Sequence, residues 1–367
     1  MLKYIEIEGY KSMKSVKIEL DSVNVLIGNN GSGKSNFVSF LKMVNAVFSG
    51  HLQNFVLTEG KADNLFYLGR KHTEKVRGRL VFSKEGEDNN YTYSFTLKDT
   101  KDGGVFIEKE IFGFNSEYDN LYWNTIENLN CEESKIIALG EYKSLYLKNY
   151  LTGFNIYHFH DTSSSSKLRA ACDINDNLYL KPDGRNLSAI LFFIKQKYPK
   201  RYKRIENAVK LIAPFIDHFI LEPNVLDENK IELRWAETSD VDSNFSAHQL
   251  SDGTIRFIAL TTVLLQPKLP EIIVIDEPEL GLHPKAVSIL SGMIKSASLQ
   301  SQIIISTQSV NLVDEFSPDE IIIVEREGGK NPTVLSRLNS GLLKTWLEDY
   351  TIGDLWERNI LNTIQPD

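Results

Sequence analysis

The octet GNNGSGKS at residues 28–35 constrains the fold of this chain more than any other segment. It follows the apolar run VNVLI at residues 23–27, which is typical of a buried parallel strand. Apolar side chains from Phe37 to Phe48 then recur at helical spacing, and Gly50 is expected to end that helix. The octet matches G-x-x-x-x-G-K-[ST] in full and lies in the strand–loop–helix context that this motif requires.

Such a loop predicts a binding site for phosphate groups. Glycines let the backbone curl so that several N–H groups point at phosphate oxygens, and the helix N-terminus adds about half a positive charge. We expect Lys34 to reach the β- and γ-phosphates of ATP and the Ser35 hydroxyl to ligate Mg²⁺. A glycine-rich turn with a chance lysine is the alternative, and the flanking strand and helix count against it. The expected nucleotide-binding residues of this loop are Gly28, Asn29, Asn30, Gly31, Ser32, Gly33, Lys34 and Ser35.

The C-terminal third of the chain predicts a parallel sheet. Uninterrupted apolar runs at residues 272–275, 303–305 and 321–324 alternate with helical stretches, as in sheets that are buried on both faces. Asp276 and Glu277 follow the first run, at the edge where open α/β sheets bind ligands. Asp276 is expected to hold Mg²⁺, and Glu277 to act as the general base for an attacking water. A strand that merely ends in acidic residues is the alternative.

Residues 250–254 (LSDGT) precede an apolar helix that is expected from Ile255 to Leu265. Taken alone, they are explained most simply as a helix start with Ser251 or Asp252 as the N-cap. A helix N-terminus also attracts anions, so a phosphate contact is the second interpretation.

In their order along the chain, the phosphate loop, LSDGT, DEPE at residues 276–279 and STQS at residues 306–309 resemble the motifs of ABC-type ATPases. They are most similar to those of the RecF/SMC-like branch, which includes ATPases of DNA repair and of bacterial antiphage systems such as the Septu and retron-linked kinds. The resemblance extends to FHDTSSSSKLR, LKPDGRNLSAIL and WLEDYTIGDLWERN, so it covers nearly the whole chain. It implies an α/β fold, namely an ABC-type P-loop ATPase head with a parallel-sheet core, an antiparallel β insertion and a short helical lid.

The same resemblance implies that two copies of the chain share ATP as a homodimer. Ser251 and Gly253 would contact the γ-phosphate held by the other copy, and residues 279–284 (ELGLHP) match the loop after the catalytic glutamate. Gln308 stands in the switch loop where many relatives carry histidine. A glutamine amide can donate a hydrogen bond to phosphate but cannot titrate near neutral pH. The expected catalytic residues are therefore Glu277 and Gln308.

Other positions depart from the family pattern or leave a role open. Asp252 replaces the first glycine of the commonest signature and places a carboxylate near the shared phosphate, so we expect slow hydrolysis. The glutamine loop that usually adds a Mg²⁺ contact is not identifiable, and we place it between Phe154 and Asp161. Lys11 lies where relatives often have a nucleotide or dimer contact, but an exposed lysine at a strand end explains it equally well.

The long segment between the phosphate loop and the acidic pair has a different character. Residues 77–114 read as an antiparallel meander, and residues 121–150 as mostly helical. His158 and His160 lie on one face of a strand expected at residues 154–159. A structural role is favoured over a metal pair for them, because no carboxylate or cysteine cluster stands nearby in the sequence.

Two amphipathic helices are expected around Pro199, and they carry an unusual charge. Between Lys195 and Lys210 stand seven basic residues and one acid, Glu206, in a chain of net charge −8. A surface for nucleic acid or another phosphate-rich partner is one interpretation, and a solvated helix face is the other. We predict three regions in all: residues 1–50 and 245–367 as the ATPase core lobe, residues 51–160 as a β-rich insertion, and residues 161–244 as a helical lid with the basic patch.

Composition narrows the classes of function that remain for this chain. The acidic balance, with 41 Lys+Arg against 49 Asp+Glu, argues against non-specific coating of nucleic acid by the whole surface. Two cysteines cannot build a disulfide framework, and no apolar stretch suits a membrane span or a leader, so we expect a cytoplasmic protein without a membrane partner. The stretch after Gln308 is short, so an effector such as a nuclease or a reverse transcriptase–DNA complex is expected as a separate chain. The rival functions are a transporter-type ATPase subunit and a scaffold that binds ATP without hydrolysing it.

Overall fold

The computed structural model describes residues 1–83, 90–115, 122–135, 153–326 and 331–361. The chain forms two compact units, Met1–Phe154 with Ser317–Asp367, and Asn155–Phe316. Parallel strands and an antiparallel insertion are both present, so the mixed α/β fold expected from the sequence is confirmed. The finer division into three regions stays a prediction.

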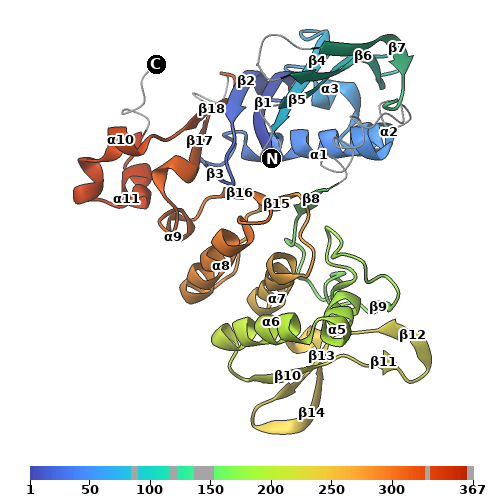
Figure 1. The fold of residues 1–367 in the computed structure, drawn as a ribbon, viewed down its shortest axis with the longest axis vertical. Helices are drawn as coiled ribbons and strands as arrows, with labels where there is room; N and C mark the ends of the chain where they lie inside the picture. Colours follow the sequence, from blue (N-terminus) through green and yellow to red (C-terminus); the bar gives the residue numbers. More distant parts are fainter. Residues whose placement is uncertain (84–89, 116–121, 136–152, 327–330, 362–367) are drawn as a thin grey trace. The chain divides into compact units, whose positions relative to one another are not determined.

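The first unit contains an antiparallel sheet in the order β2-β1-β4-β5-β6-β7 (Figure 1). Leu2, Ile5 and Ile7 on β1 are fully buried, while Glu6 and Glu8 remain partly exposed, as expected for a sheet with one solvated face. The meander predicted over residues 77–114 is confirmed, and it continues on both sides. The strands are β1 (Leu2–Tyr10), β2 (Met13–Glu19), β4 (Lys75–Ser83), β5 (Asn90–Asp99), β6 (Val105–Asn115) and β7 (Tyr122–Cys131).

β7 corrects the expectation of a mostly helical segment over residues 121–150. It pairs with β6 in antiparallel register from Phe114 opposite Tyr122 to Ile107 opposite Cys131. The free edge of β6 offers a full row of hydrogen-bonding groups, and pairing with it outweighs local helix propensity. The remainder of the predicted helical segment, residues 136–152, lies outside the described residues.

Helix α1 (Lys34–Ser49) forms the core of the first unit together with this sheet (Figure 1). The ring of Phe40 lies 5.5 Å from that of Tyr10 and 6.2 Å from that of Phe95, centroid to centroid. Gly50 adopts a left-handed conformation and its N–H bonds to the last turn, so α1 ends where the sequence predicted. The other helices of the unit are α2 (Leu52–Thr58), α3 (Lys61–Leu65), η3 (Pro318–Glu320), α10 (Ser340–Leu343), η5 (Trp346–Glu348) and α11 (Ile352–Glu357).

Parallel strands occur in both units. In the first, β3 (Val23–Ile27) pairs in parallel with β17 (Ile321–Glu325), which pairs antiparallel with β18 (Val334–Arg337). In the second, β15 (Ile272–Asp276) lies between β16 (Gln302–Thr307), its parallel partner, and β8 (Phe154–Tyr157). Every residue of β3, β15 and β16 is buried, as the apolar runs predicted.

The two predicted amphipathic helices of the second unit are present. They are α5 (Leu187–Lys197) and α6 (Pro199–Ile212), and Pro199 opens α6 because the first helical position needs no backbone N–H. Both pack against α7 (Figure 1). The remaining helices of the unit are η2 (Ala247–Gln249), α7 (Asp252–Leu265), α8 (Pro284–Ala297) and α9 (Val310–Val313).

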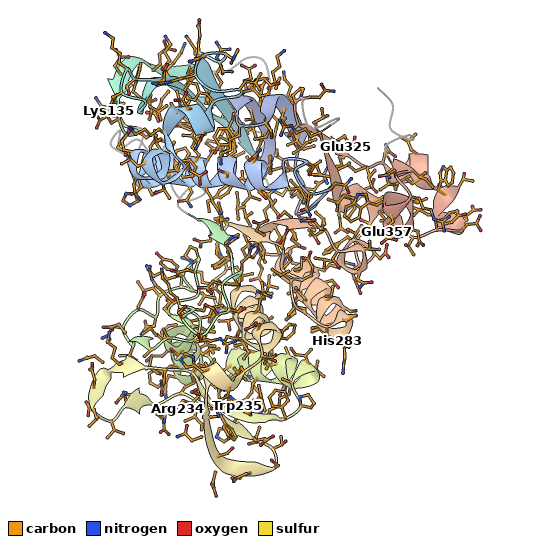
Figure 2. The ribbon with its side chains drawn as sticks, turned by 180° about the vertical axis from the view of Figure 1, so that it is seen from behind. Lys135, Arg234, Trp235, His283, Glu325 and Glu357 are labelled. Carbon is orange, nitrogen blue, oxygen red and sulfur yellow. The ribbon has the colours of Figure 1, made fainter. Side chains whose placement is uncertain are left out.

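Small antiparallel sheets complete the second unit. Trp235, labelled in Figure 2, lies on β13 (Arg234–Glu237). Its ring packs between those of Phe215 and Phe245, at centroid distances of 5.4 and 4.9 Å, and forms a local aromatic core. The strands are β9 (Cys172–Asp173), β10 (Ile216–Ile220), β11 (Pro223–Asn224), β12 (Asp227–Ile231), β13 (Arg234–Glu237) and β14 (Asp240–Ser246).

Candidate functional site: a phosphate loop and an acidic strand end

The octet at residues 28–35 forms a tight loop between β3 and α1. Gly31 has a φ of +79° and Gly33 a φ of +117°, values that side chains with a Cβ rarely adopt. A Cβ on Gly33 would also lie 2.4 Å from the hydroxyl oxygen of Thr333. α1 begins at Lys34 without a side-chain cap, so the first N–H groups of the helix remain available to an anion.

Lys34 folds back over this loop. Its ammonium donates hydrogen bonds to the main-chain oxygens of Gly28 and, at 3.2 Å, of Asn29, and the residue is only 6% exposed. Ser35 is exposed in the first turn of α1. The predicted phosphate-binding residues therefore lie together, with a buried cation inside the curve of the loop.

Thr333 clamps the loop from a distant part of the sequence. Its hydroxyl is fully buried, donates to the main-chain oxygen of Ser32 at 2.8 Å and lies 2.7 Å from the hydroxyl of Ser12. Its main-chain N–H donates to the carbonyl oxygen of Ser12 at 2.8 Å. No sequence motif pointed to Thr333, because its partners are some 300 positions away.

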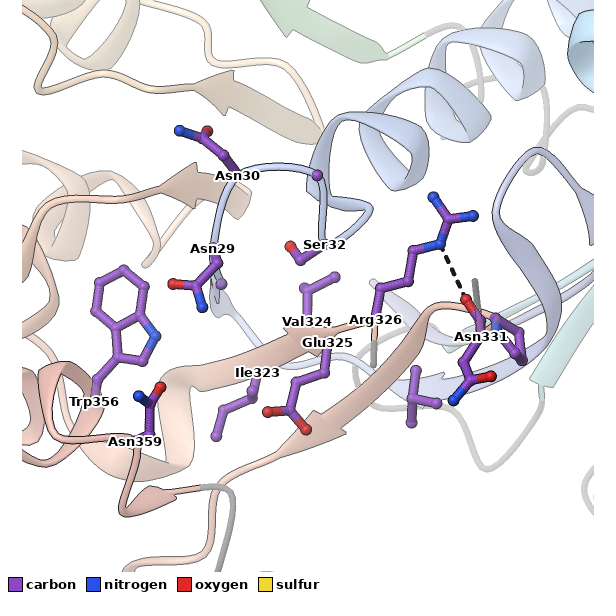
Figure 3. Close-up of a pocket in the computed structure, with 14 residues that line it drawn as sticks. Asn29, Asn30, Ser32, Ile323, Val324, Glu325, Arg326, Asn331, Trp356 and Asn359 are labelled. Atoms are coloured by element: carbon purple, nitrogen blue, oxygen red, sulfur yellow. Dashed lines mark hydrogen bonds between the residues drawn. The ribbon is translucent and has the colours of Figure 1, made fainter. Parts of the chain in front are cut away.

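A cavity of about 890 Å³ lies beside the loop (Figure 3). Trp356 and Asn359 stand at one end of it, and Arg326, whose Nε donates to the Asn331 oxygen at 3.0 Å, stands at the other (Figure 3). Neither Lys34 nor Ser35 is among the described residues that line it.

Lys11 is held in place within the first unit. Its ammonium lies 2.6 Å from a carboxylate oxygen of Glu59 and 2.8 Å from the hydroxyl of Ser39, and its side chain is 18% exposed. Its φ of +47° is unusual for a residue with a Cβ. The exposed strand-end lysine considered from the sequence does not describe it. A role in nucleotide contact stays a prediction.

In the second unit, Asp276 ends β15 beside the end of β16. Its carboxylate accepts a hydrogen bond from the hydroxyl of Ser306 and lies 3.3 Å from Nδ1 of His158. Burial opposes ionisation of this carboxyl, but the hydrogen bonds from His158 and Ser306 outweigh burial and hold its pKa below the ordinary value. An ionised carboxylate at a sheet edge is able to bind a cation.

Glu277 and Gln308 meet at the same edge. The side-chain amide of Gln308 donates to the Glu277 carboxylate at 2.7 Å, and both residues face solvent in part. Glu277 has a φ of +46°, a strained conformation for glutamate of the kind found at functional sites. The structure thus joins the two residues predicted to be catalytic.

Glu279 is the second carboxylate of this edge. One of its oxygens accepts from the hydroxyl of Thr307 at 2.6 Å and from the N–H of Gln308 at 3.3 Å. The other is buried with no hydrogen-bond partner among the described residues. Burial raises the pKa of this carboxyl above its usual value.

Ser251 and Gly253 begin α7. The Ser251 side chain accepts from the N–H of Thr254 at 3.2 Å, so it serves as the N-cap that the simpler interpretation predicted. A Cβ on Gly253 would stand 2.4 Å from the carbonyl oxygen of Gly281, so the helix start packs directly on the loop after the acidic pair. Capping and a phosphate contact are compatible, because the other N–H groups of this first turn remain available to an anion.

Two buried arginines, which sequence reasoning missed, hold this region together. Arg169 donates to the carbonyl oxygens of Thr162, Ala247 and Leu250, and it pairs with Asp252 at 2.8 Å. Arg256 donates to the carbonyl oxygens of Phe159, His160 and Leu280. Because the Arg169 cation compensates the Asp252 carboxylate, this carboxylate repels a nearby phosphate less than an unpaired one would. The slow hydrolysis expected from Asp252 stays a prediction.

His158 and His160 also lie at the Asp276 edge. Their ring centroids are 3.9 Å apart, and Nε2 of His160 is 3.1 Å from the main-chain oxygen of Asp276. The sequence suggested no carboxylate near this pair, but the fold supplies that of Asp276, which lies 3.3 Å from Nδ1 of His158. The segment predicted to contain the glutamine loop is thus the one that contacts Asp276, through histidines.

The basic segment spans α5 and α6. Lys203 pairs with Glu206 at 2.9 Å, and Lys195 lies 5.5 Å from the ring centroid of Tyr202. Exposed basic side chains remain along it, namely those of Lys195, Lys197, Lys200, Lys203 and Arg204.

Comparison with solved structures identifies the fold. The chain is similar to an SMC head bound to the C-terminal winged-helix domain of ScpA, with a TM-score of 0.62 and 18% identity over 93% of this chain and 99% of that one. It is also similar to an SMC head domain with an extended coiled coil bound to the C-terminal domain of ScpA, derived from Pyrococcus furiosus. There the TM-score is 0.56 and the identity 17% over 95% of this chain and 98% of that one. At these identities the likeness shows the fold alone.

Comparison with curated proteins gives a shorter match. The chain is 36% identical over 83 residues to the energy-coupling factor transporter ATP-binding protein EcfA2 of Staphylococcus saprophyticus. That match spans 22% of this chain and 28% of the length of EcfA2. None of the described helices has the length and apolar character that a bilayer crossing requires.

Residues 23–314 match the family described as "AAA domain, putative AbiEii toxin, Type IV TA system". The match includes the phosphate loop, the start of α7, the acidic strand end and Gln308, and it covers most of the chain. The chain therefore belongs to this AAA-domain family of ATPases, which are of the AAA/ABC class.

Proposed function

We propose that this chain binds ATP at residues 28–35 and hydrolyses it. The observation that carries the proposal is the loop between β3 and α1, with left-handed glycines, uncapped helical N–H groups and the buried ammonium of Lys34. Because that ammonium is held by loop carbonyls, an anionic phosphate in the loop would be a better partner for it. Loops of this kind bind the phosphates of nucleoside triphosphates.

The residues for Mg²⁺ and for water activation fit the same reaction. The exposed hydroxyl of Ser35 and the ionised carboxylate of Asp276 are each an oxygen ligand of the kind that Mg²⁺ takes, and bound Mg²⁺ would neutralise phosphate charge. Glu277 acts as the general base, and Gln308 positions its carboxylate through the 2.7 Å hydrogen bond. Gln308 would sense the γ-phosphate by donating a hydrogen bond to it from the switch loop, residues 306–309.

Two copies of the chain share the nucleotides. ATP held by the loop of one copy is closed off by Ser251 and Gly253 of the other, at the N-terminus of α7. The tight contact between Gly253 and Gly281 supports this, because it couples the helix start to the loop that follows Glu277. The output of hydrolysis is then the opening of a homodimer.

The biological role we propose is nucleic-acid-linked, in DNA repair or antiphage defence, with a separate effector chain such as a nuclease or a reverse transcriptase–DNA complex. The exposed basic side chains of α5 and α6 support a nucleic-acid contact. Lys200→Glu combined with Arg204→Glu should weaken DNA binding and reduce its salt dependence, whereas Lys230→Glu with Lys268→Glu, which are also exposed, should do neither. Equal binding by both double variants would refute this contact.

The similarity to EcfA2 favours a second candidate, a transporter-type ATPase subunit. That candidate predicts that a membrane-protein partner co-purifies with the native chain, and the main proposal predicts an effector or nucleic acid instead. A scaffold that binds ATP without turnover is the third candidate, and it predicts ATP binding without phosphate release.

Phosphate release by the purified protein tests the hydrolysis proposal. Lys34→Ala should lose ATP binding, and Glu277→Gln should keep ATP binding but lose turnover by a factor of roughly 10²–10⁴. Unchanged affinity in Lys34→Ala would refute the loop assignment. A normal rate in Glu277→Gln would refute the base.

A further inference from the structure

His158, His160 and Asp276 form a cluster whose donor atoms have the chemistry of a transition-metal site. One ring nitrogen of each histidine and one carboxylate oxygen all lie within 4.8 Å of one another. Two imidazoles with one carboxylate suit Zn²⁺, Mn²⁺ or Co²⁺, whereas Mg²⁺ takes oxygen ligands almost exclusively. The donor set therefore selects a different ion from the one expected beside ATP.

The spacing of the donors fits a small first-row ion. With metal–ligand bonds of about 2.0–2.1 Å, two ligands of a tetrahedral site are about 3.3 Å apart. Nδ1 of His158 and a carboxylate oxygen of Asp276 are 3.3 Å apart. Nε2 of His160 lies 3.1 Å from the main-chain oxygen of the same aspartate, and the two rings are inclined by 31°. One donor atom of His160 lies within 4.8 Å of the other two, so all three residues are within reach of a single ion.

The surroundings hold these ligands in place. Ser306 donates to the other oxygen of Asp276, which leaves the oxygen facing His158 free for an ion. The backbone next to the histidines is fixed by the buried Arg256, which donates to the carbonyl oxygens of Phe159 and His160. The His158 side chain is 43% exposed, so an ion and its remaining water ligands have access.

We infer that His158, His160 and Asp276 bind a divalent transition-metal ion in the absence of nucleotide. The inference goes beyond the proposed function, because it requires neither the phosphate loop nor a second copy of the chain. It also gives the pair of histidines a role that a purely structural interpretation lacks. At this sheet edge, Mn²⁺, Co²⁺ or Zn²⁺ binds in preference to Mg²⁺.

Titration with Co²⁺ tests the inference, using protein without a polyhistidine tag and without nucleotide. We expect saturable binding in calorimetry, accompanied by visible ligand-field absorption, that excess Mg²⁺ does not displace. His158→Gln and His160→Gln should each weaken Co²⁺ affinity at least about tenfold. His248→Gln is the matched control, because His248 is an exposed histidine of the same unit, and it should bind Co²⁺ like the wild type.

Absence of saturable Co²⁺ binding by the wild type would overturn the inference, as would unchanged affinity in both cluster variants. Circular dichroism and melting temperature of each variant separate ligand loss from misfolding. Lys34→Ala distinguishes this inference from the proposed function, because it should lose ATP and retain Co²⁺. Wild-type protein that binds Co²⁺ but never hydrolyses ATP would refute only the proposed function.

Discussion

Thr333 gives the sharpest prediction, because its buried hydroxyl joins the phosphate loop to Ser12 in the turn between β1 and β2. Thr333→Val keeps the shape of the side chain and removes its hydrogen bonds to the Ser32 carbonyl and the Ser12 hydroxyl. The Ser12 hydroxyl keeps the hydrogen bond from the Asn36 amide, so the main cost is the hydrogen bond lost by the Ser32 carbonyl oxygen, about 1–3 kcal/mol. We expect the melting temperature of the first unit to fall by roughly 3–9 °C.

The loss should also appear in ATP binding, since the clamp holds the loop in its curled form. If about 1.4 kcal/mol of the cost is specific to the curled loop, affinity falls about tenfold. Calorimetric titration with a non-hydrolysable ATP analogue measures the affinity, and thermal unfolding measures stability. Thr333→Ser, which keeps the hydroxyl, should restore most of both.

Thr261 supplies the matched control. It is also fully buried, but its hydroxyl has no hydrogen-bond partner among the described residues. Thr261→Val should therefore leave the melting temperature unchanged or raise it. If both valine variants behave alike, or if Thr333→Val binds the analogue with wild-type affinity, the clamp reasoning is wrong.

Other predictions test the second unit. Gly253→Ala should lower the melting temperature, because its Cβ would lie 2.4 Å from a carbonyl oxygen. Gly292→Ala should stabilise the protein by about 0.5–1 kcal/mol, because Gly292 is helical and nothing lies within 4 Å of the added Cβ. Equal shifts in melting temperature for the two variants would contradict this. Arg169→Met should lower the free energy of unfolding by at least about 2 kcal/mol, because it leaves buried carbonyl oxygens without a donor. Asp252→Asn should lower it by less than about 1 kcal/mol, because that carboxylate is 66% exposed. Chemical denaturation measures both changes. Because burial raises the pKa of Glu279, the stability of the wild type declines as pH rises through that pKa. Glu279→Gln should therefore have a higher melting temperature than the wild type at about pH 8 and lose this advantage below about pH 4. A difference in melting temperature that does not change with pH would refute the assignment.

The sequence predicted the parts of the site whose signals are local. The octet at residues 28–35, the cap at Ser251 and the acidic pair after β15 each lie within one short segment, where turn chemistry and apolar runs fix the conformation. The order of these motifs along the chain then indicated the family resemblance. Gln308 and Glu277 form a hydrogen bond with each other, and their catalytic role stays a prediction.

Residues that act across long sequence separations escaped prediction. Thr333 reaches Ser32, and Arg169 reaches Leu250, through contacts that no spacing in the sequence encodes. His158 looked isolated because its carboxylate partner arrives only when β8 takes its place beside β15. β7 was mistaken for helix, since its pairing with β6 is a tertiary effect that outweighs local propensity.

The central claim, that two copies of the chain share ATP, is tested most directly by mixing two inactive variants. Lys34→Ala lacks the phosphate loop cation, and Ser251→Arg blocks the opposite face, so neither should hydrolyse ATP alone. A mixed dimer contains one intact composite site, made from the loop of the Ser251→Arg copy and the α7 start of the Lys34→Ala copy. The account predicts that mixing restores roughly a quarter of the wild-type rate, because half of randomly paired dimers are mixed and each has a single active site. A mixture as inactive as its components, from variants that fold and still dimerise with wild-type protein, would contradict it.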